Sequence, residues 1–306
     1  MGGVKMLTYK TLELTDKIWI DEIVEGSNVI SSEHPFVSNF LWNDFLALEL
    51  VDNKKFFSVF SKKKQAYLFP IFKDANNINE KQKEVIGLLK EDAKTRSLPL
   101  KLYGITPEMK LSLENLFPGK FKYIVKRDTA DYIYKIEDLV HLKGKKYHSK
   151  RNFINSFKNN YNGWEYKVLK KCMFEECLNI NLNWYGEKLN NPFDDVLSYE
   201  VKMLNLAFKY FNELGLFGGA ITLNKKIIGF SLGYKINNSV VDNIIEKALV
   251  EYKGVYNILL QQFLEHLQPN YIYVNREEDL GLENLKQAKL SLHPYNILNK
   301  YEALWL

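Results

Sequence analysis

The same order of strand-like and helix-like segments occurs twice along the 306 residues of this chain. In the first half, apolar runs predict strands at 45–51, 55–60 and 65–72, a helix at 80–95, a strand at 99–103, a helix at 107–116, and strands at 121–125 and 131–136. In the second half they predict strands at 216–223, 226–234 and 239–249, a helix at 255–267, a strand at 271–274, a helix at 282–290 and a strand at 296–301. This repetition predicts two α+β units that arose by internal duplication.

A short sequence match supports the duplication. Residues 111–116 read LSLENL and residues 280–285 read LGLENL, each after an apolar strand, at a constant offset of 169 residues. The residues that precede the match differ in charge, since residues 106–110 read TPEMK where residues 275–279 read NREED. We therefore expect the chemistry in the C-terminal unit and a non-catalytic N-terminal unit.

Composition and charge are those of a two-domain globular protein. A hydrophobic content of 46% can fill two cores, and the net charge of +5 with a pI near 8.8 is compatible with a nucleic-acid or acidic-lipid partner. No run of about 18 apolar residues occurs, and the N-terminal MGGVKM lacks the apolar core of a signal peptide, so we expect a cytoplasmic protein without a transmembrane segment. Cys172 and Cys177 have no histidine nearby, and we expect no metal site.

The stretch from Asn275 to Pro294, NREEDLGLENLKQAKLSLHP, carries four carboxylates and three basic side chains directly after an apolar strand. Its carboxylates have a structural explanation, because acidic groups near a helix N-terminus favour the helix dipole by about 0.3–1 kcal/mol each. The alternative is a functional site, whose candidate residues in this stretch are Asn275, Arg276, Glu277, Asp279 and Lys289.

A second charged feature, the basic segment KGKKYHSKR at residues 143–151, holds five positive charges, and no acidic residue follows it until Glu165. Cations at the start of a helix oppose the helix dipole, so the pattern favours an anionic ligand there. We expect the helix to begin near Ser149 as N-cap, with the lysines before it on a loop. A solvated surface is the alternative to a phosphate-binding cluster, whose candidates are Lys145, Lys146, Lys150, Arg151 and Asn152.

The two charged elements resemble the soluble relatives of the C-terminal domain of bacterial phosphatidylglycerol lysyltransferase. Members of this family carry GKKxxSKRNxxNxF, which matches residues 144–157 here, and NREEDLGxxxLxxAKxSxxP, which matches residues 275–294. The phrases Ala130-Asp131-Tyr132-Ile133-Tyr134 and Asn299-Lys300-Tyr301 also fit, so the resemblance spans nearly the whole chain.

The resemblance implies an α+β or α/β fold of two tandem N-acetyltransferase-like (GNAT-like) domains, each a mixed central sheet flanked by helices. The expected boundaries are an N-terminal domain at 1–138, a basic connecting segment and helix at 139–163, and a C-terminal domain with the site at 164–306. Enzymes of this form move aminoacyl groups from transfer RNA to lipids or peptidoglycan precursors.

The predicted strand at 239–249 is the next candidate, because the matching central strand of N-acetyltransferase-like folds carries the general base. Strict alternation would place Asp242 and Glu246 on one face. Burial on an apolar strand would raise the pKa of a carboxylate toward the value that a base needs, so Glu246 is the favoured base and Asp242 the weaker candidate. The alternative for Glu246 is a structural ion pair with Arg276 or Lys289.

The loop after this strand bears on the acyl donor. Acetyl-CoA-using members of the wider superfamily show Q/R-x-x-G-x-G/A there, a loop that holds pyrophosphate at a helix N-terminus. Residues 251–256 read EYKGVY, in which only Gly254 fits, although Lys253 supplies a positive charge. The departure argues against coenzyme A and is compatible with another donor.

The sequence thus favours an acyltransferase, an aminoacyl transferase with aminoacyl-tRNA as donor. Glu246 or Asp279 would take the proton of an amine or hydroxyl acceptor, Arg276 or Lys289 would hold a phosphate or oxyanion, and the basic segment would hold the tRNA. Without the membrane-embedded domain of the full enzymes, a peptide, amino acid or cell-wall precursor is at least as good an acceptor as a lipid. The alternatives are an N-acetyltransferase that uses acetyl-CoA or another acyl-CoA, and a non-catalytic polyanion-binding protein.

Overall fold

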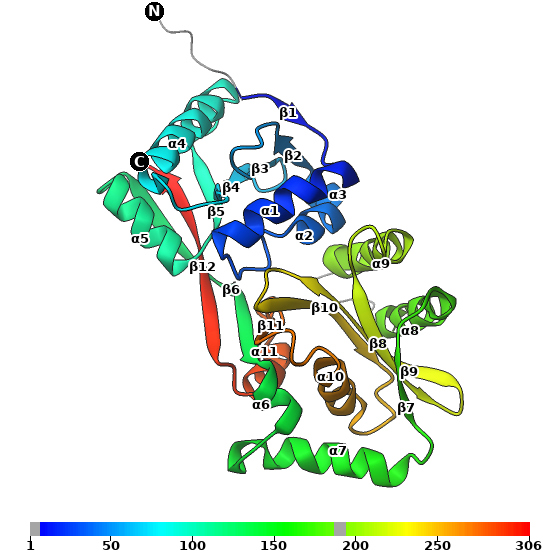
Figure 1. Ribbon diagram of the computed structural model, residues 1–306. Helices are drawn as coiled ribbons and strands as arrows, with labels where there is room; N and C mark the ends of the chain where they lie inside the picture. Colours follow the sequence, from blue (N-terminus) through cyan, green and yellow to red (C-terminus); the bar gives the residue numbers. More distant parts are fainter. Residues whose placement is uncertain (1–6, 187–193) are drawn as a thin grey trace, which may run out of the picture. The chain divides into compact units, whose positions relative to one another are not determined.

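The computed structural model describes residues 7–186 and 194–306 (Figure 1). These residues pack into two compact units that are interleaved along the sequence. Unit 1 contains Met1–Asp131, Glu278–Leu285 and Ile297–Leu306, and unit 2 contains Tyr132–Glu277 and Lys286–Asn296. The domain boundaries expected after residues 138 and 163 stay a prediction.

Unit 1 is built on a mixed sheet with helices around it (Figure 1). Its strand order is β1 (Tyr9–Lys10), β2 (Leu48–Val51), β3 (Val59–Ser61), β4 (Ala66–Leu68), β5 (Lys101–Ile105), β12 (Asn296–Trp305) and β6 (Phe121–Lys135), of which β4 and β5 are parallel. The helices are η1 (Leu14–Asp16), α1 (Lys17–Ser27), α2 (Phe36–Leu41), α3 (Asn43–Leu46), α4 (Ile78–Thr95) and α5 (Pro107–Leu116).

Helix α4 is fixed to the sheet of unit 1 by a polar contact as well as by its apolar face. Asp92 of α4 accepts hydrogen bonds of 2.6 Å from the hydroxyls of both Tyr9 and Tyr67. One turn later Arg96 pairs with Asp92 and with Glu49. Because all these polar groups have partners, α4 can cover the sheet without leaving a buried charge unpaired.

Unit 2 continues from the end of β6 with the strand order β11 (Tyr273–Asn275), β10 (Val240–Ala248), β9 (Lys226–Lys235), β8 (Phe217–Leu223) and β7 (Glu165–Val168). Strands β10 and β11 are parallel, and β7 to β10 are antiparallel. The helices are α6 (Ile136–His141), η2 (Lys145–Tyr147), α7 (His148–Asn160), η3 (Lys171–Met173), α8 (Phe174–Gly186), α9 (Asp194–Lys209), α10 (Val255–Glu265) and α11 (Glu283–Leu290), the last of which begins in unit 1.

Helices cover both faces of the sheet in unit 2. Phe230 of β9 contacts Phe208 of α9, with ring centroids 6.3 Å apart. Phe217 of β8 pairs with Gly233, which lies three residues after Phe230 on β9. The ring centroid of Phe217 lies 6.0 Å from that of Phe263 in α10. Residues an odd number apart on a strand point to opposite faces, so α9 covers one face and α10 the other.

A β-bulge in β10 places Asp242 and Glu246 on opposite faces of this sheet. Asp242 pairs with Tyr234 of β9, and Glu246 pairs with Ser231. An advance of four residues along β10 therefore corresponds to three residues along β9, which means that β10 contains one extra residue. Glu246 therefore points to the face covered by α10, and Asp242 points to the other face, where the Tyr234 hydroxyl donates to it at 3.1 Å. The prediction that the two carboxylates share a face was wrong, because strict alternation does not survive a bulge.

Four further expectations about local structure need correction. The strands predicted at 121–125 and 131–136 form the single strand β6, and the start of the strand predicted at 45–51 belongs to α3. Helix α7 begins at His148 after the turn η2, so Ser149 is not its N-cap. The two copies of the hexapeptide also differ, because Leu111 and Ser112 are helical whereas Leu280 and Gly281 have φ of 53° and 72°.

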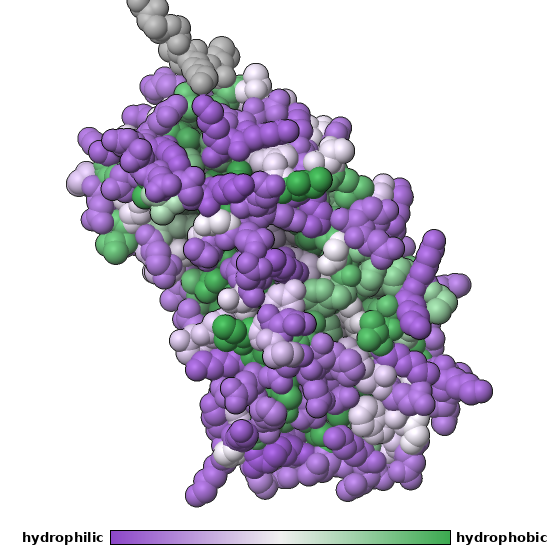
Figure 2. Space-filling view, viewed as in Figure 1, coloured by the Kyte–Doolittle hydropathy of each residue, from purple (hydrophilic) through white to green (hydrophobic). Residues whose placement is uncertain are grey.

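The surface of the face seen in Figure 2 is mostly hydrophilic, which agrees with apolar side chains buried in the cores of the two units. Among the described helices, none combines the length and the apolar character needed to cross a bilayer.

Candidate functional site

The candidate active site of unit 2 is an ion pair between Glu246 of β10 and Arg276, which directly follows β11. Arg276 Nη2 lies 2.9 Å from Glu246 Oε1, and the side chains are only 13% and 12% exposed. Glu246 Oε2 and Arg276 Nε are buried, and neither has a hydrogen-bond partner within the described part of the chain. A buried acceptor and a buried donor are therefore left available side by side.

The site lies where the parallel strands β10 and β11 stop pairing. Their register ends at Asp242 opposite Asn275, and the bulge of β10 follows at once. The backbone of Arg276 is held on the other side, because its N–H donates to the carbonyl of Tyr132 at 3.0 Å. The pair of Glu246 and Arg276 thus spans the two strands beyond the last paired residues.

The loop that carries Arg276 is fixed by Asn275, which is fully buried. Its side-chain oxygen accepts the N–H of Glu277 at 2.8 Å, which stabilises Glu277 at the left-handed φ of 54°. Asn275 is therefore a positioning residue for the loop. The carbonyl of Glu277 accepts from the N–H of Tyr132 at 3.2 Å, which holds the loop from its other end.

Lys289 of α11 contacts the backbone of the same loop. It is buried, and its ammonium donates to the carbonyl oxygens of Arg276 and Glu277, the second at 3.1 Å. The Tyr134 hydroxyl donates to the carbonyl of Lys289 at 2.8 Å. Lys289 thus holds the backbone at Arg276, and its expected contact with a phosphate or oxyanion stays a prediction.

The electrostatics of the site suit proton transfer. Burial raises the pKa of the Glu246 carboxyl, and the charges of Arg276 and Lys289 oppose that rise. Burial and the charge of Arg276 lower the pKa of Lys150. A carboxylate whose proton affinity is raised in this way is a stronger base than one in water.

The basic segment is divided between structural and exposed positions. Arg151 donates to the carbonyls of Leu142 and Gly144, and the half-buried Lys150 donates to Ser291 Oγ at 2.7 Å. Lys145 and Lys146 are exposed. Asn152 is also exposed, with its amide 3.4 Å from the ring of His148.

Lys253 and Gly254 directly precede α10, and the N-terminus of this helix is covered by other parts of the protein. Gly254 has φ of 92°, and an atom at its Cβ position would lie 2.4 Å from the carbonyl oxygen of Phe153 in α7. The N–H of Val255 already donates to Tyr252, and that of Asn257 to Gly254. Lys253 is exposed, and its N–H donates to the Tyr161 hydroxyl at 3.2 Å. Glycine is thus required at 254 by the close approach of two helices.

Asp279, the alternative base, belongs to unit 1 and has structural partners there. Its side chain is 2% exposed, and it pairs with Arg127 at 3.1 Å. It also accepts the N–H of Gly281 at 2.9 Å, which closes the turn before α11. These contacts favour a role in fixing the turn.

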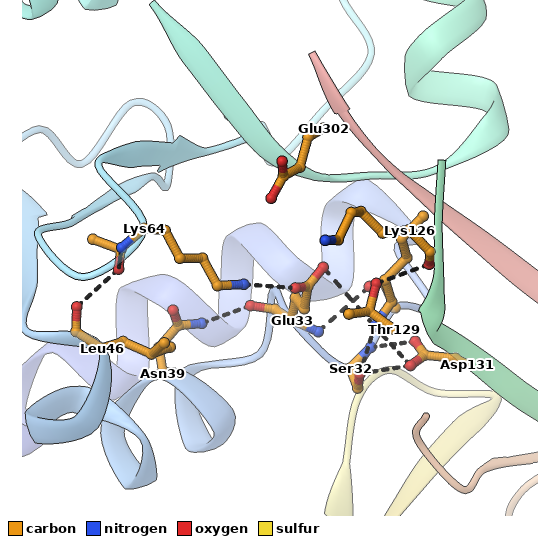
Figure 3. Close-up of polar contacts among 12 residues, drawn as sticks. Ser32, Glu33, Asn39, Leu46, Lys64, Lys126, Thr129, Asp131 and Glu302 are labelled. Atoms are coloured by element: carbon orange, nitrogen blue, oxygen red, sulfur yellow. Dashed lines mark hydrogen bonds and ion pairs between the residues drawn. The ribbon is translucent and has the colours of Figure 1, made fainter. Parts of the chain in front are cut away.

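The sequence analysis missed a buried polar cluster in unit 1 (Figure 3). Lys300 Nζ lies 2.7 Å from Asp131 Oδ1 and 3.1 Å from Ser32 Oγ, and all three side chains are buried. Asp131 also accepts from the N–H and the hydroxyl of Ser32, at 2.9 and 2.8 Å. Asp131 and Lys300 both stand in phrases that carry the family resemblance, so a signal for the pair was present in the sequence.

The comparison with known families decides the identity of the chain. The model of the family described as phosphatidylglycerol lysyltransferase, C-terminal, matches residues 28–304. The chain belongs to this family. The phosphatidylglycerol lysyltransferase C-terminal family is named for a transferase.

Solved structures confirm the expected N-acetyltransferase-like fold. A conserved protein of unknown function from Bacteroides thetaiotaomicron is 31% identical, with a TM-score of 0.90 over 98% of this chain and 100% of that one. L-PGS from Bacillus licheniformis is 14% identical, with a TM-score of 0.63 over 95% and 91% of the two chains. FemX is 8% identical, with a TM-score of 0.64 over 96% of each chain.

A curated relative in Mycoplasmoides gallisepticum is an uncharacterised protein. It is 27% identical over 188 residues, which make up 60% of this chain and 59% of that protein. The match therefore spans less than two thirds of the relative.

Metal ligation has no candidate cluster among the described residues. In residues 7–186 and 194–306, no group of three or more His, Cys, Asp or Glu side chains is arranged to hold a metal ion. Cys172 is exposed and Cys177 is buried, and both are free thiols.

Proposed function

We propose that this member of the phosphatidylglycerol lysyltransferase C-terminal family transfers an aminoacyl group from aminoacyl-tRNA to an amine or hydroxyl acceptor, with Glu246 as the base. The observation that carries the proposal is the orphan Oε2 of Glu246, a buried carboxylate oxygen that has no hydrogen-bond partner within the described residues. An orphan acceptor of this kind costs about 1–3 kcal/mol in the free protein, so a donor on the substrate gains that amount on binding.

In the proposed step, Glu246 Oε2 takes a proton from the acceptor as the acceptor nitrogen or oxygen forms a bond to the ester carbonyl carbon. The bond from that carbon to the ribose oxygen of the tRNA then breaks, and the proton passes to the departing oxygen. The free Nε–H of Arg276 is placed to donate to the oxyanion or to a substrate oxygen beside the base. Asn275 and Lys289 keep the loop of Arg276 in place.

Two observations support aminoacyl-tRNA over acyl-CoA as donor. At the start of α10, the N–H groups of residues 255 and 257 already donate to backbone carbonyls, and the backbone of α7 lies against Gly254. These N–H groups are therefore not available to bind a pyrophosphate. Lys145 and Lys146 are exposed and can contact phosphates of a polyanion. Arg151, in contrast, is proposed as a structural residue of the segment.

The decisive experiment measures transfer of labelled amino acids from bulk charged tRNA to a lipid extract and to a low-molecular-weight extract, for the wild type and for Glu246→Gln. We expect label in one acceptor pool and a loss of about 10²–10⁴-fold in the variant. The matched control is Glu200→Gln, which removes another part-buried carboxylate of unit 2, paired with Lys247 at 2.8 Å, and should keep the activity.

The rival functions give different results in the same buffers. Acetyl transfer from acetyl-CoA with no use of charged tRNA would replace the proposal with a coenzyme A-dependent N-acetyltransferase. Binding of tRNA that is unchanged by Glu246→Gln, with no transfer to either pool, would make the chain a polyanion-binding protein.

A further inference from the structure

Glu33 and His34 are adjacent residues of unit 1 that the proposed transfer does not use, and each has a buried polar atom without a hydrogen bond in the described part of the chain. Glu33 Oε2 and His34 Nδ1 are buried, and neither has a hydrogen-bond partner among residues 7–186 and 194–306. His34 is fully buried, whereas the Glu33 side chain keeps 20% of its exposure. The Glu33 side chain is thus partly exposed, although its Oε2 atom is buried, and the imidazole of His34 is enclosed.

The two groups face the same spot beside strand β5. An atom at the Cβ position of Gly104 would lie 2.7 Å from Leu68 Cδ1, 3.1 Å from Glu33 Oε2 and 3.5 Å from His34 Cε1, the ring carbon between the two nitrogens. Gly104 has φ of 70°, a conformation that favours glycine. The backbone of β5 therefore leaves room for these two side chains where any other residue would crowd them.

Both unpartnered atoms are acceptors. His34 Nε2 lies 3.3 Å from the carbonyl oxygen of Phe69, and since a carbonyl only accepts, Nε2 carries the ring hydrogen and Nδ1 has the bare lone pair. Burial lowers the pKa of His34 to about 4, which keeps the ring neutral. The charges of Lys300 and Lys64 overcome burial and keep the pKa of Glu33 below its ordinary value, so this carboxylate is ionised.

The contact with Lys64 shows that the Glu33 carboxylate binds a cationic nitrogen. Its ammonium lies 3.4 Å from Glu33 Oε1 and 4.2 Å from the ring centroid of Tyr103, so Glu33 and Tyr103 already hold one cationic nitrogen (Figure 3). The contact to Glu33 is long for a charged hydrogen bond, and Lys64 is 30% exposed. Lys300, in contrast, is buried against Asp131 and lies 3.9 Å from Glu33 Oε2.

We infer that Glu33 and His34 form a binding site for an organic ammonium group, which replaces Lys64 on the Glu33 carboxylate. The three N–H donors of a primary ammonium match the carboxylate and the bare imidazole nitrogen. The exchange of one cation for another leaves the charge of the cluster unchanged, which removes the objection that Lys64 and Lys300 would repel the ligand. The site would take the amino group of a small amine, of an amino acid or of a peptide.

The test follows the imidazole protons of the full chain by NMR during a titration with n-propylammonium chloride. The sequence has five histidines, and a His34→Gln spectrum assigns the His34 signal. We expect a saturable shift of the His34 Cε1–H signal. Tetramethylammonium, which has the charge without N–H donors, and n-propanol, which has a donor without the charge, should each bind at least about tenfold more weakly.

Substitutions of the two members of the Glu33–Lys64 ion pair should change the affinity for n-propylammonium in opposite directions. Glu33→Gln should weaken n-propylammonium binding about tenfold or more, and Lys64→Met should strengthen it, because it removes the competing ammonium. Glu22→Gln, which removes an exposed carboxylate of unit 1, is the matched control and should change nothing.

The wild-type titration keeps the proposal falsifiable even where a variant fails to fold. No saturable shift of the His34 signal, equal shifts with all three probes, or a shift that survives Glu33→Gln would each overturn the inference. Because the measurement is binding and not transfer, its failure is distinct from a failure of the proposed reaction at Glu246.

Discussion

Arg276 contacts one carboxylate oxygen of Glu246 at 2.9 Å and leaves the other oxygen buried and unpartnered among the described residues. A purely structural ion pair is most stable when both oxygens are satisfied. The unsatisfied oxygen of Glu246 therefore lowers the stability of the folded protein, at the point where β10 and β11 stop pairing.

The pH dependence of stability should carry the signature of Glu246. Its folded-state pKa is raised, so the native state binds more protons than the unfolded state in the window between the ordinary carboxyl pKa and the raised one. The free energy of unfolding should therefore fall as pH rises through that window. Urea denaturation at a series of pH values should show this fall in the wild type and lose it in Glu246→Gln. An unchanged profile in the variant would contradict the assignment.

A double-mutant cycle should separate the ion pair from the rest of the site. Arg276→Met leaves a buried carboxylate without its partner and should destabilise unit 2 by about 3–5 kcal/mol. Adding Glu246→Gln to Arg276→Met should recover part of that loss, because no charge then remains to be compensated. The check is urea denaturation of the four proteins, and strictly additive losses would show that the two side chains do not interact.

The pair of Lys300 and Asp131 should contribute more to stability than any exposed pair in unit 1. Lys300→Met removes the ion-pair partner of the fully buried Asp131 and should cost about 3–5 kcal/mol, while the double variant Lys300→Met/Asp131→Asn should cost less than the sum of the two single changes. Lys73→Met, which breaks an exposed pair with Glu22, should change the free energy of unfolding by less than about 0.5 kcal/mol. Equal effects of Lys300→Met and Lys73→Met would refute the argument.

Gly254 and Gly144 form a matched pair for testing the contact between α10 and α7. Their φ values are 92° and 87°, but only Gly254 has an atom within 4 Å of its Cβ position, the Phe153 oxygen at 2.4 Å. Gly144→Ala should cost about 1 kcal/mol through backbone strain alone, and Gly254→Ala should cost at least twice that. Thermal unfolding measures both. A similar loss in the two variants would mean that α7 moves aside without cost.

The sequence predicted the fold better than the site. Long apolar runs such as β9, β10 and α5 follow period and propensity, so their positions were predicted to within about two residues. The bulge after Asp242 depends on Asn243, whose amide donates to Ser231 Oγ and to the carbonyls of Leu232 and Ile245. No sequence pattern marks such a bulge, and it alone decides which face Glu246 occupies.

The roles of the candidate residues were also beyond a single-sequence argument. Arg276 and Glu246 were expected as a pair or as separate catalytic groups, and the structure brings them into contact. Arg151 and Lys289 are predicted ligand contacts, and the structure shows that both donate to backbone carbonyls. The sequence does not show whether a lysine or arginine will donate its hydrogen bonds to a carbonyl or to a phosphate, because tertiary packing determines which acceptor lies nearby.

The interleaving of the two units has a consequence for synthesis. Unit 1 takes its strand β12 from the end of the chain, where β12 pairs with β5 and supplies Lys300 to Asp131, 169 residues earlier. A nascent chain therefore holds an open sheet edge on β5 and an uncompensated carboxylate at Asp131 until residues 297–306 emerge from the ribosome. Truncation within Ile297–Leu306 would then damage the unit that was synthesised first, and residues 7–131 should depend on chaperones until this segment has been translated.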